Sequence, residues 1–169
     1  MKWGDFERAA PELAGLGLAA FTEEHNMCLI GTLRADGWPR ISASELYIVD
    51  GELLLGMMRR SRKSLDLERD PRITVMTPQA EREPTHGDFK LYGRAANVND
   101  LGLRDAYGRT IFAAIGWRPT EPYPLWSVDI DSAAYISFGD RHRLVRWTPA
   151  GGVEELQHPD DTPGAGAPD

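Results

Sequence analysis

Two Asp-Gly pairs, at positions 36–37 and 50–51, constrain the fold of this chain more than any other feature of its sequence. Each pair lies between two apolar segments, and glycine readily adopts the positive φ that a tight hairpin turn requires. The segments around the pairs are therefore predicted to be three strands, over residues 27–34, 39–50 and 52–58. Two hairpins in succession predict an antiparallel meander and argue against a sheet built from β-α-β units.

The rest of the chain continues this mainly β pattern with a few helices. Further strands are predicted over residues 72–77, 89–98, 125–130, 133–138 and 142–147. Helices are predicted over residues 5–24, with a break or restart at Pro11, over 61–69, and over 100–115. About six to eight mostly hairpin-linked strands with two or three helices favour a closed or nearly closed antiparallel barrel, because closure removes exposed strand edges. A mixed sandwich is the alternative.

Length and charge limit the domain organisation and the partners. The 169 residues are predicted to form one domain over 1–157, while residues 158–169 offer almost nothing to bury and are predicted to be disordered. The formal net charge of −7 argues against nonspecific nucleic-acid binding, which depends on an excess of Lys and Arg. A local cluster of cations can still bind a single phosphate group.

The sequence predicts a cytoplasmic protein without a membrane span. No apolar run approaches the roughly 20 residues that are needed to cross a bilayer. The first residues, MKWGDFER, are too polar for the apolar region of a signal peptide. The single cysteine, Cys28, has no internal disulfide partner, which agrees with a reducing compartment. Cys28 itself is interpreted as a buried strand residue and not as a reactive thiol.

The segment MRRSRKSLDLERDP, residues 58–71, places four cations, Arg59, Arg60, Arg62 and Lys63, at the start of a predicted helix. Ser61 is a good N-cap residue, able to accept a hydrogen bond from an early backbone N–H. Cations in the first turn oppose the helix dipole, at about 0.3–1 kcal/mol each. A bound phosphate resolves this conflict, because free N–H groups and flanking cations form an anion site. The alternative is a solvated arginine-rich turn, which the charge pattern alone favours.

The order of several motifs resembles the pyridoxamine 5'-phosphate oxidase superfamily, the FMN-binding split β-barrels. Gly37 and Pro39 enter the second strand, Ser61-Arg62-Lys63 opens a helix after the third, and Asp70-Pro71 ends that helix. FKLYGRA, residues 89–95, and RHRLVRWTPAGGVEE, residues 141–155, resemble later strands of the family. The resemblance covers about residues 21–155. It implies an antiparallel split β-barrel that forms a homodimer around its cofactors.

The resemblance also implies cofactor-binding residues. The basic pair would bind the flavin phosphate with the help of the preceding serine, the second strand would line the ring, and the two methionines would flank the ring or the ribityl chain. The residues are Ser42, Ala43, Ser44, Met57, Met58, Ser61, Arg62 and Lys63. Barrel core is the alternative for one of the two methionines, since neighbours on a strand face opposite sides.

The sequence departs from true pyridoxamine phosphate oxidases at three positions. Ser42 replaces an arginine, Tyr47 replaces a lysine and Asp88 replaces a glutamine, and the late pattern that holds the substrate phosphate is missing. The resemblance therefore implies an oxidoreductase that uses FMN, or the deazaflavin coenzyme F-420, on a small organic molecule other than vitamin B6. Arg59 and Arg60 are interpreted as solvated, or as partners of a deazaflavin's acidic tail. The alternatives are a non-enzymatic flavin or haem carrier, and a ligand-free interaction module.

Other candidate sites have little support from the sequence. The four histidines show no metal-ligand spacing, so no metal site is predicted. No catalytic residue is predicted, because the cofactor carries the hydride in flavin chemistry; His86 is interpreted as an ordinary loop residue. Trp126 is interpreted as core or interface packing, with stacking on a flavin as the alternative, and Trp38 as a rim or dimer contact.

Overall fold

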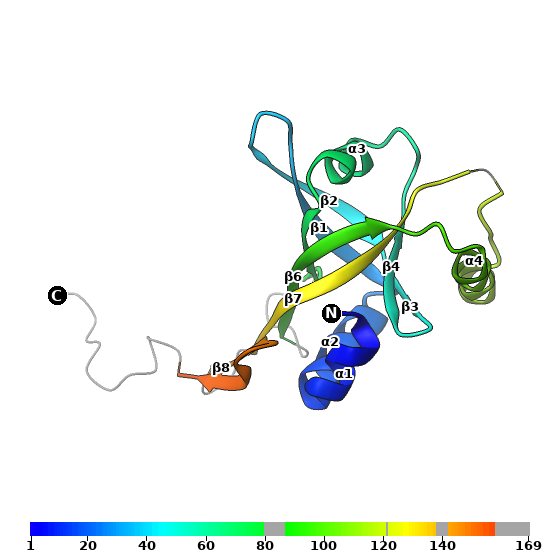
Figure 1. Cartoon of the computed structure of the whole chain (residues 1–169). Helices are drawn as coiled ribbons and strands as arrows, with labels where there is room; N and C mark the ends of the chain where they lie inside the picture. The colour runs from blue at the N-terminus through cyan, green and yellow to red at the C-terminus, as the bar shows by residue number, and fades with distance from the viewer. Residues whose placement is uncertain (80–86, 121, 138–141, 158–169) are drawn as a thin grey trace.

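Both predicted hairpins are present in the computed structural model, which describes residues 1–79, 87–120, 122–137 and 142–157 (Figure 1). The described strands are β1 (Met27–Leu33), β2 (Pro39–Glu45), β3 (Tyr47–Val49), β4 (Glu52–Gly56), β5 (Arg72–Met76), β6 (Asp88–Asn97), β7 (Leu125–Ser137), β8 (Arg143–Thr148) and β9 (Gly152–Leu156). The described helices are α1 (Trp3–Ala9), α2 (Pro11–Glu23), α3 (Arg62–Arg69) and α4 (Leu101–Ile115).

All nine described strands belong to one antiparallel sheet. Its order is β2-β1-β5-β6-β7-β4-β3, with β8 pairing β7 and β9 pairing β8. The end strands β2 and β3 do not pair with each other in the described residues, so the barrel is split and not closed. Figure 1 shows α1 and α2 at one end of the barrel, α3 at the other, and α4 to one side. The predicted fold class, a mainly β split barrel, is confirmed.

The two turns have the predicted backbone conformation, but the single strand that was predicted between them is divided in two. Gly37 and Gly51 have φ of 84° and 76°, as the two Asp-Gly hairpins require. The predicted strand 39–50 is two strands, because β2 pairs with β1 whereas β3 pairs with β4. The division falls at Leu46, which is buried and whose N–H donates to the carbonyl of Asn26 (2.8 Å). The prediction of a continuous meander was therefore wrong: the two hairpins lie at opposite ends of the sheet.

A second correction concerns β7. The sequence predicts two strands over 125–130 and 133–138, but β7 is continuous from Leu125 to Ser137. Tyr92 pairs with Ser132 and Gly93 with Ile130, so Asp131 is the extra residue of a β-bulge. A side chain at Gly93 would collide with the backbone of Asp129, which is why the bulge forms at a glycine. Because 39–50 is split, 125–138 is merged into β7 and β9 is additional, the described part of the chain has nine strands where six to eight were predicted.

The main core lies between the sheet and the helices α1 and α2. Aromatic side chains meet there edge to face, with ring centroids 4.8 Å apart for Phe6 and Trp147 and 5.7 Å apart for Phe21 and Phe89. Trp126 is also part of this core, and its indole N–H donates to Ser64 of α3 (3.4 Å), so the packing interpretation of Trp126 is confirmed. A second, smaller cluster of buried side chains packs under α4.

None of the described helices is long and apolar enough to span a bilayer. The predicted turn at residues 139–140, the loop residue His86 and the predicted tail 158–169 lie outside the described residues.

Candidate functional site

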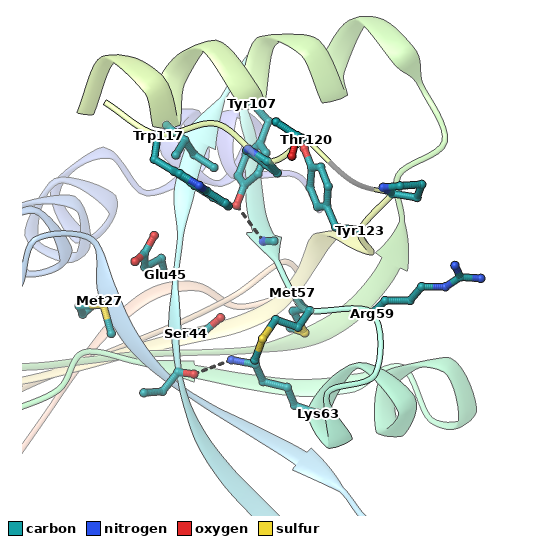
Figure 2. A pocket seen from close by; sticks show the side chains of 16 residues that line it. Met27, Ser44, Glu45, Met57, Arg59, Lys63, Tyr107, Trp117, Thr120 and Tyr123 are labelled. Atoms are coloured by element: carbon teal, nitrogen blue, oxygen red, sulfur yellow. Dashed lines mark hydrogen bonds between the residues drawn. The ribbon is translucent and has the colours of Figure 1, made fainter. Parts of the chain in front are cut away.

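A cavity of about 700 Å³ opens beside the barrel (Figure 2). It is bounded by the ends of β2 and β4, the start of α3, the inner face of α4 and the segment that follows α4. Its 16 lining residues are Met27, Ala43, Ser44, Glu45, Gly56, Met57, Met58, Arg59, Lys63, Tyr107, Ile111, Trp117, Pro119, Thr120, Pro122 and Tyr123. The cavity therefore joins segments that are far apart in the sequence.

Lys63 supplies a positive charge at the cavity wall. Its ammonium group crosses from α3 to β2 and donates to the carbonyl oxygen of Ala43 (2.5 Å), as Figure 2 shows. Partial burial lowers the pKa of Lys63, while the nearby Cys28 and Glu45 oppose that shift. An ammonium group has three donors. Those that do not reach Ala43 remain available to an anionic group in the cavity.

A buried carboxylate fixes the helix that carries Lys63. Asp66 of α3 accepts hydrogen bonds from Thr32 (3.0 Å), Arg40 (2.6 Å) and Arg69 (3.3 Å). Burial alone would raise the pKa of Asp66, but the hydrogen bonds from Arg40, Thr32 and Arg69 outweigh it and hold the pKa below its usual value. These contacts connect α3 to the β1–β2 hairpin. They therefore hold Lys63 of α3 in a fixed position relative to Ala43 of β2.

Ser61 occupies the N-cap position of α3 but does not cap it. Its backbone is extended, with φ of −67° and ψ of 140°, yet its side chain makes no capping hydrogen bond. The prediction that the hydroxyl accepts from an early N–H was therefore wrong. The Ser61 Oγ is buried and has no hydrogen-bond partner among the described residues.

Three arginines at this end of the cavity lack partners. Arg59, Arg60 and Arg62 are exposed and make no hydrogen bond or ion pair with any residue that the structure describes. Every other described arginine makes at least one such contact. The positive charge at the start of α3 is thus free of local neutralisation, and Arg59 reaches the cavity itself.

The opposite wall of the cavity is aromatic. The hydroxyl oxygen of Tyr107 accepts a hydrogen bond from the N–H of Gly56 (2.9 Å), and burial raises the pKa of Tyr107. The rings of Tyr107 and Tyr123 are 6.2 Å apart between centroids, and the guanidinium of Arg104 lies 4.7 Å from the centre of the Tyr123 ring. A side chain at Gly56 would collide with Tyr107, so glycine is needed for this contact.

The structure brings five of the eight predicted site residues to the cavity: Ala43, Ser44, Met57, Met58 and Lys63. The other three, Ser42, Ser61 and Arg62, do not line it. Met57 is 5% exposed and Met58 is 78% exposed, so they face different surroundings although both reach the cavity. The Ser44 Oγ is buried without a partner among the described residues.

Sequence reasoning missed the aromatic wall. It predicted the helix over 100–115, but not that Tyr107 and Ile111 of this helix, which pack in the smaller core, would also line the cavity. Trp117 and Tyr123 lie in the proline-rich link after α4, and Glu45 lies at the end of β2. The aromatic residues of that link were the one available signal in the sequence.

Among the described residues, no group of three or more His, Cys, Asp or Glu side chains gathers closely enough to hold a metal ion.

Fold and cavity define the class of protein: a split β-barrel with a side cavity that is basic at one end and aromatic at the other. A family model described as pyridoxamine 5'-phosphate oxidase matches residues 17–137. The chain belongs to the pyridoxamine 5'-phosphate oxidase family. The family resemblance that the motifs indicate is therefore confirmed.

Solved structures share this fold at low identity. A pyridoxamine 5'-phosphate oxidase-related, FMN binding protein from Nostoc punctiforme matches with 13% identity and a TM-score of 0.66, over 85% of this chain and 96% of that one. PhzG from Burkholderia lata, in complex with tetrahydrophenazine-1-carboxylic acid, matches with 13% identity and a TM-score of 0.64, over 89% and 93%.

A haem binding protein from Mycobacterium smegmatis matches with 19% identity and a TM-score of 0.59. That match covers 74% of this chain and 54% of the other, so this chain spans about half the length of that relative. No curated protein matches the chain. At these identities the likenesses show the fold.

Proposed function

We propose that this protein binds a flavin, FMN or its deazaflavin analogue coenzyme F-420, and transfers hydride to or from a small organic molecule. The observation that carries the proposal is the ammonium of Lys63 at one end of a cavity of about 700 Å³ whose other wall is aromatic. A flavin has the matching shape, with a planar ring and an acidic group at the end of a flexible chain. Small-molecule sites are commonly about 300–1,000 Å³ and mostly apolar, with a few placed polar groups.

The polar groups of the cavity fit such a ligand. The Ser44 hydroxyl is buried without a partner among the described residues, and leaving such a group unsatisfied costs about 1–3 kcal/mol. An isoalloxazine ring carries both carbonyl oxygens and ring nitrogens that can satisfy a hydroxyl. Lys63, which lines the cavity, would hold the phosphate, with help from the unpaired Arg62 beside it at the start of α3. Met57 and Met58 would offer apolar, polarisable surface to the ring or the ribityl chain.

When bound, the flavin supplies the hydride chemistry, and the protein supplies position and electrostatics. Lys63 would supply positive charge to the acidic group of the cofactor. Tyr107 stays a neutral phenol, since burial raises its pKa. Its buried ring would exclude water from that side of the cavity. We assign no catalytic acid or base. The arginine and lysine missing from positions 42 and 47 support a substrate other than a vitamin B6 phosphate.

The choice between FMN and the deazaflavin depends on the three unpaired arginines. One phosphate is satisfied by Lys63 and Arg62, whereas Arg59 and Arg60 would still lack a partner. The longer acidic tail of the deazaflavin would give both of them carboxylates. FMN is the first expectation because of the family, and F-420 is the alternative that Arg59 and Arg60 support.

A titration tests the proposal directly. The absorbance spectrum of the freshly purified protein reports any bound flavin, and titration with FMN and with F-420 gives the dissociation constants. Replacing Arg62 and Lys63 together by alanine should weaken cofactor binding about a hundredfold or more, because charged hydrogen bonds contribute about 1.5–3 kcal/mol each. Arg94→Ala, at an exposed arginine on β6, is the control and should leave affinity unchanged. Failure of both cofactors to bind at micromolar concentration would refute the proposal.

A haem or flavin carrier without turnover is the alternative use of the same cavity. The described lining contains no histidine or cysteine, and Tyr107 already accepts a hydrogen bond through the oxygen that would ligate iron. Of the usual axial ligands of haem iron, the described lining keeps only the thioethers and Tyr123, which makes haem the weaker fit. A Soret band in the purified protein would favour haem, and turnover with candidate acceptors would separate an enzyme from a flavin carrier.

We also propose that the protein forms a homodimer. Strand β2 is an end strand of the sheet and exposes Ile41 at 76%, and Trp38, directly before the strand, is 68% exposed. Met58, which lines the cavity, is 78% exposed. A second copy that covers this surface would bury apolar area and close one side of the cavity. Light scattering after gel filtration measures the mass, and a monomer at micromolar concentration would contradict the proposal.

A further inference from the structure

We propose that Tyr107 determines the ligand specificity of the cavity by donating a hydrogen bond, through its hydroxyl, to a carbonyl oxygen of the bound ring system. The hydroxyl of Ser44 supplies a second donor of the same kind. This inference rests on the proposed function, because it places the cofactor ring against the aromatic wall. It goes beyond that function by naming the residue that selects the ring and the ring chemistry that is selected.

The hydroxyl of Tyr107 has a proton that is not used within the described structure. Tyr107 is buried and lines the cavity, and its oxygen accepts a hydrogen bond from the N–H of Gly56 (2.9 Å), as Figure 2 shows. A phenol can also donate, and its proton must point away from the N–H that it faces. Glu45 is close enough to raise the pKa of Tyr107, but neither Glu45 nor any other described residue accepts this proton. The donor is therefore left for a ligand.

The surroundings of Tyr107 hold this donor in place. Its ring lies edge to face with Tyr47, with centroids 5.9 Å apart, and 6.2 Å from the centroid of Tyr123. The backbone of Gly56 fixes the hydroxyl end. Burial raises the pKa of Tyr107, so the hydroxyl keeps its proton at neutral pH. A donor that is fixed in this way loses little conformational entropy when a ligand binds.

Ser44 is the second unmatched donor. Its side chain is buried and lines the cavity, and its Oγ has no hydrogen-bond partner among the described residues. A carbonyl oxygen can accept from either hydroxyl, whereas a hydrocarbon ring leaves both without a partner. A site with buried donors rejects a ligand of the same shape that lacks acceptors, because the donors lose water and gain no hydrogen bond. The two hydroxyls therefore select rings that carry carbonyl groups.

Two probes of matched shape test this selection. Anthraquinone-2-sulfonate and anthracene-2-sulfonate share three fused rings and one anionic group, and only the quinone carries ring carbonyls. Binding is measured on the full chain by isothermal titration calorimetry. Lys63→Ala should weaken binding of both sulfonates, which shows that they occupy this cavity. Burial alone favours the anthracene, the more apolar ring. The wild-type protein should nevertheless bind the quinone about tenfold more tightly.

Tyr107→Phe should remove this preference, by weakening quinone binding about tenfold and leaving anthracene binding unchanged. The anthracene probe is needed because phenylalanine also deprives the Gly56 N–H of its acceptor, and a purely structural effect would weaken binding of both probes alike. Ser44→Ala should reduce the preference in the same direction. Tyr92→Phe, at an exposed tyrosine on β6 outside the cavity lining, is the matched control and should change nothing.

A wild-type protein that binds the quinone no more tightly than the anthracene would overturn the inference, and so would a Tyr107→Phe protein that keeps the preference. Should Tyr107→Phe fail to fold, a preference in the wild type that Ser44→Ala reduces supports the inference, and an absent preference overturns it. If FMN binds wild type and Tyr107→Phe equally well, the inference fails while the flavin proposal stands. If neither flavin binds but the quinone preference depends on Tyr107, the flavin proposal fails and the selection for ring carbonyls stands.

Discussion

Replacing Asp66 by asparagine is the sharpest test of how the barrel holds α3. The side chain of Asp66 is 5% exposed and accepts from Thr32, Arg40 and Arg69. Asparagine has nearly the same shape but carries one acceptor oxygen and no charge. Its oxygen, in the place of Oδ2, can still accept from Thr32 and Arg40, but its NH₂ group cannot accept from Arg69. The ion pair with Arg40, whose side chain is 28% exposed, is lost.

The expected cost follows from these contacts. Hydrogen bonds to a charged group contribute about 1.5–3 kcal/mol each, and breaking a fully buried ion pair costs about 3–5 kcal/mol. Since Arg40 is partly solvated and the two hydrogen bonds to Oδ2 can survive in uncharged form, we expect a loss of about 2–4 kcal/mol in the free energy of unfolding. At about 2–4 °C per kcal/mol for a chain of this size, the Tm should fall by roughly 5–15 °C.

The effect should depend on pH in a defined direction. The folded protein lowers the pKa of Asp66, so the ionised group stabilises the fold above its unfolded pKa of about 4. That contribution is lost as the pH falls through the lower folded value. The difference in stability between wild type and Asp66→Asn should therefore be full at pH 7 and shrink below about pH 4.

Urea unfolding followed by circular dichroism measures the difference, with Asp5→Asn as the control. Asp5 pairs with Arg8 on α1, but both side chains are more than half exposed, so that substitution should change stability by less than about 0.5 kcal/mol. A double-mutant cycle with Arg40→Met should show coupling between the two substitutions, because Arg40 donates a hydrogen bond directly to Asp66 Oδ2. An Asp66→Asn protein within about 0.5 kcal/mol of wild type at pH 7 would refute the reasoning.

Two further predictions use single sites. The Cys28 thiol should not react with a thiol reagent at pH 8 until the protein unfolds, because the side chain is 1% exposed and burial raises its pKa to about 12; rapid labelling in native buffer would contradict this. Gly56→Ala should displace Tyr107 and break its hydrogen bond to residue 56, which should weaken FMN binding at least tenfold by titration while β4 still pairs with β7. Unchanged affinity would show that the aromatic wall does not touch the cofactor.

Local signals predicted the elements, and long-range pairing decided where strands divide. The turns at 36–37 and 50–51 were predicted correctly, because a tight turn depends only on a few neighbouring residues and its glycine adopts a positive φ. The break at Leu46 was not, because it exists only where one strand leaves β1 and the next joins β4. The bulge at Asp131 likewise depends on the register with β6, which no local window contains.

The candidate site shows the same division. Lys63 was predicted from a short motif, and it reaches the cavity because the Asp66 contacts brace its helix. The hydroxyl of Ser61 was expected to cap α3 and does not, since a favourable residue type does not guarantee the rotamer that capping needs. Glu45 and Trp117 were missed because a cavity brings together side chains about seventy residues apart, and no spacing rule covers that distance.

The unpaired arginines argue for an acidic ligand beyond what the helix dipole implies. The chain has 26 Asp and Glu against 19 Lys and Arg, so a surface arginine is more often near a carboxylate than not. Every other described arginine has found a carboxylate or a carbonyl, whereas Arg59, Arg60 and Arg62 have none among the described residues. In a solvated turn we would expect these arginines to pair with nearby carboxylates as the others do, because exposed ion pairs form without special geometry. Each such pair contributes about 0–1 kcal/mol. Three neighbouring cations without partners among the described residues, close to the cavity wall that carries Lys63, therefore support the proposed site for an anionic ligand.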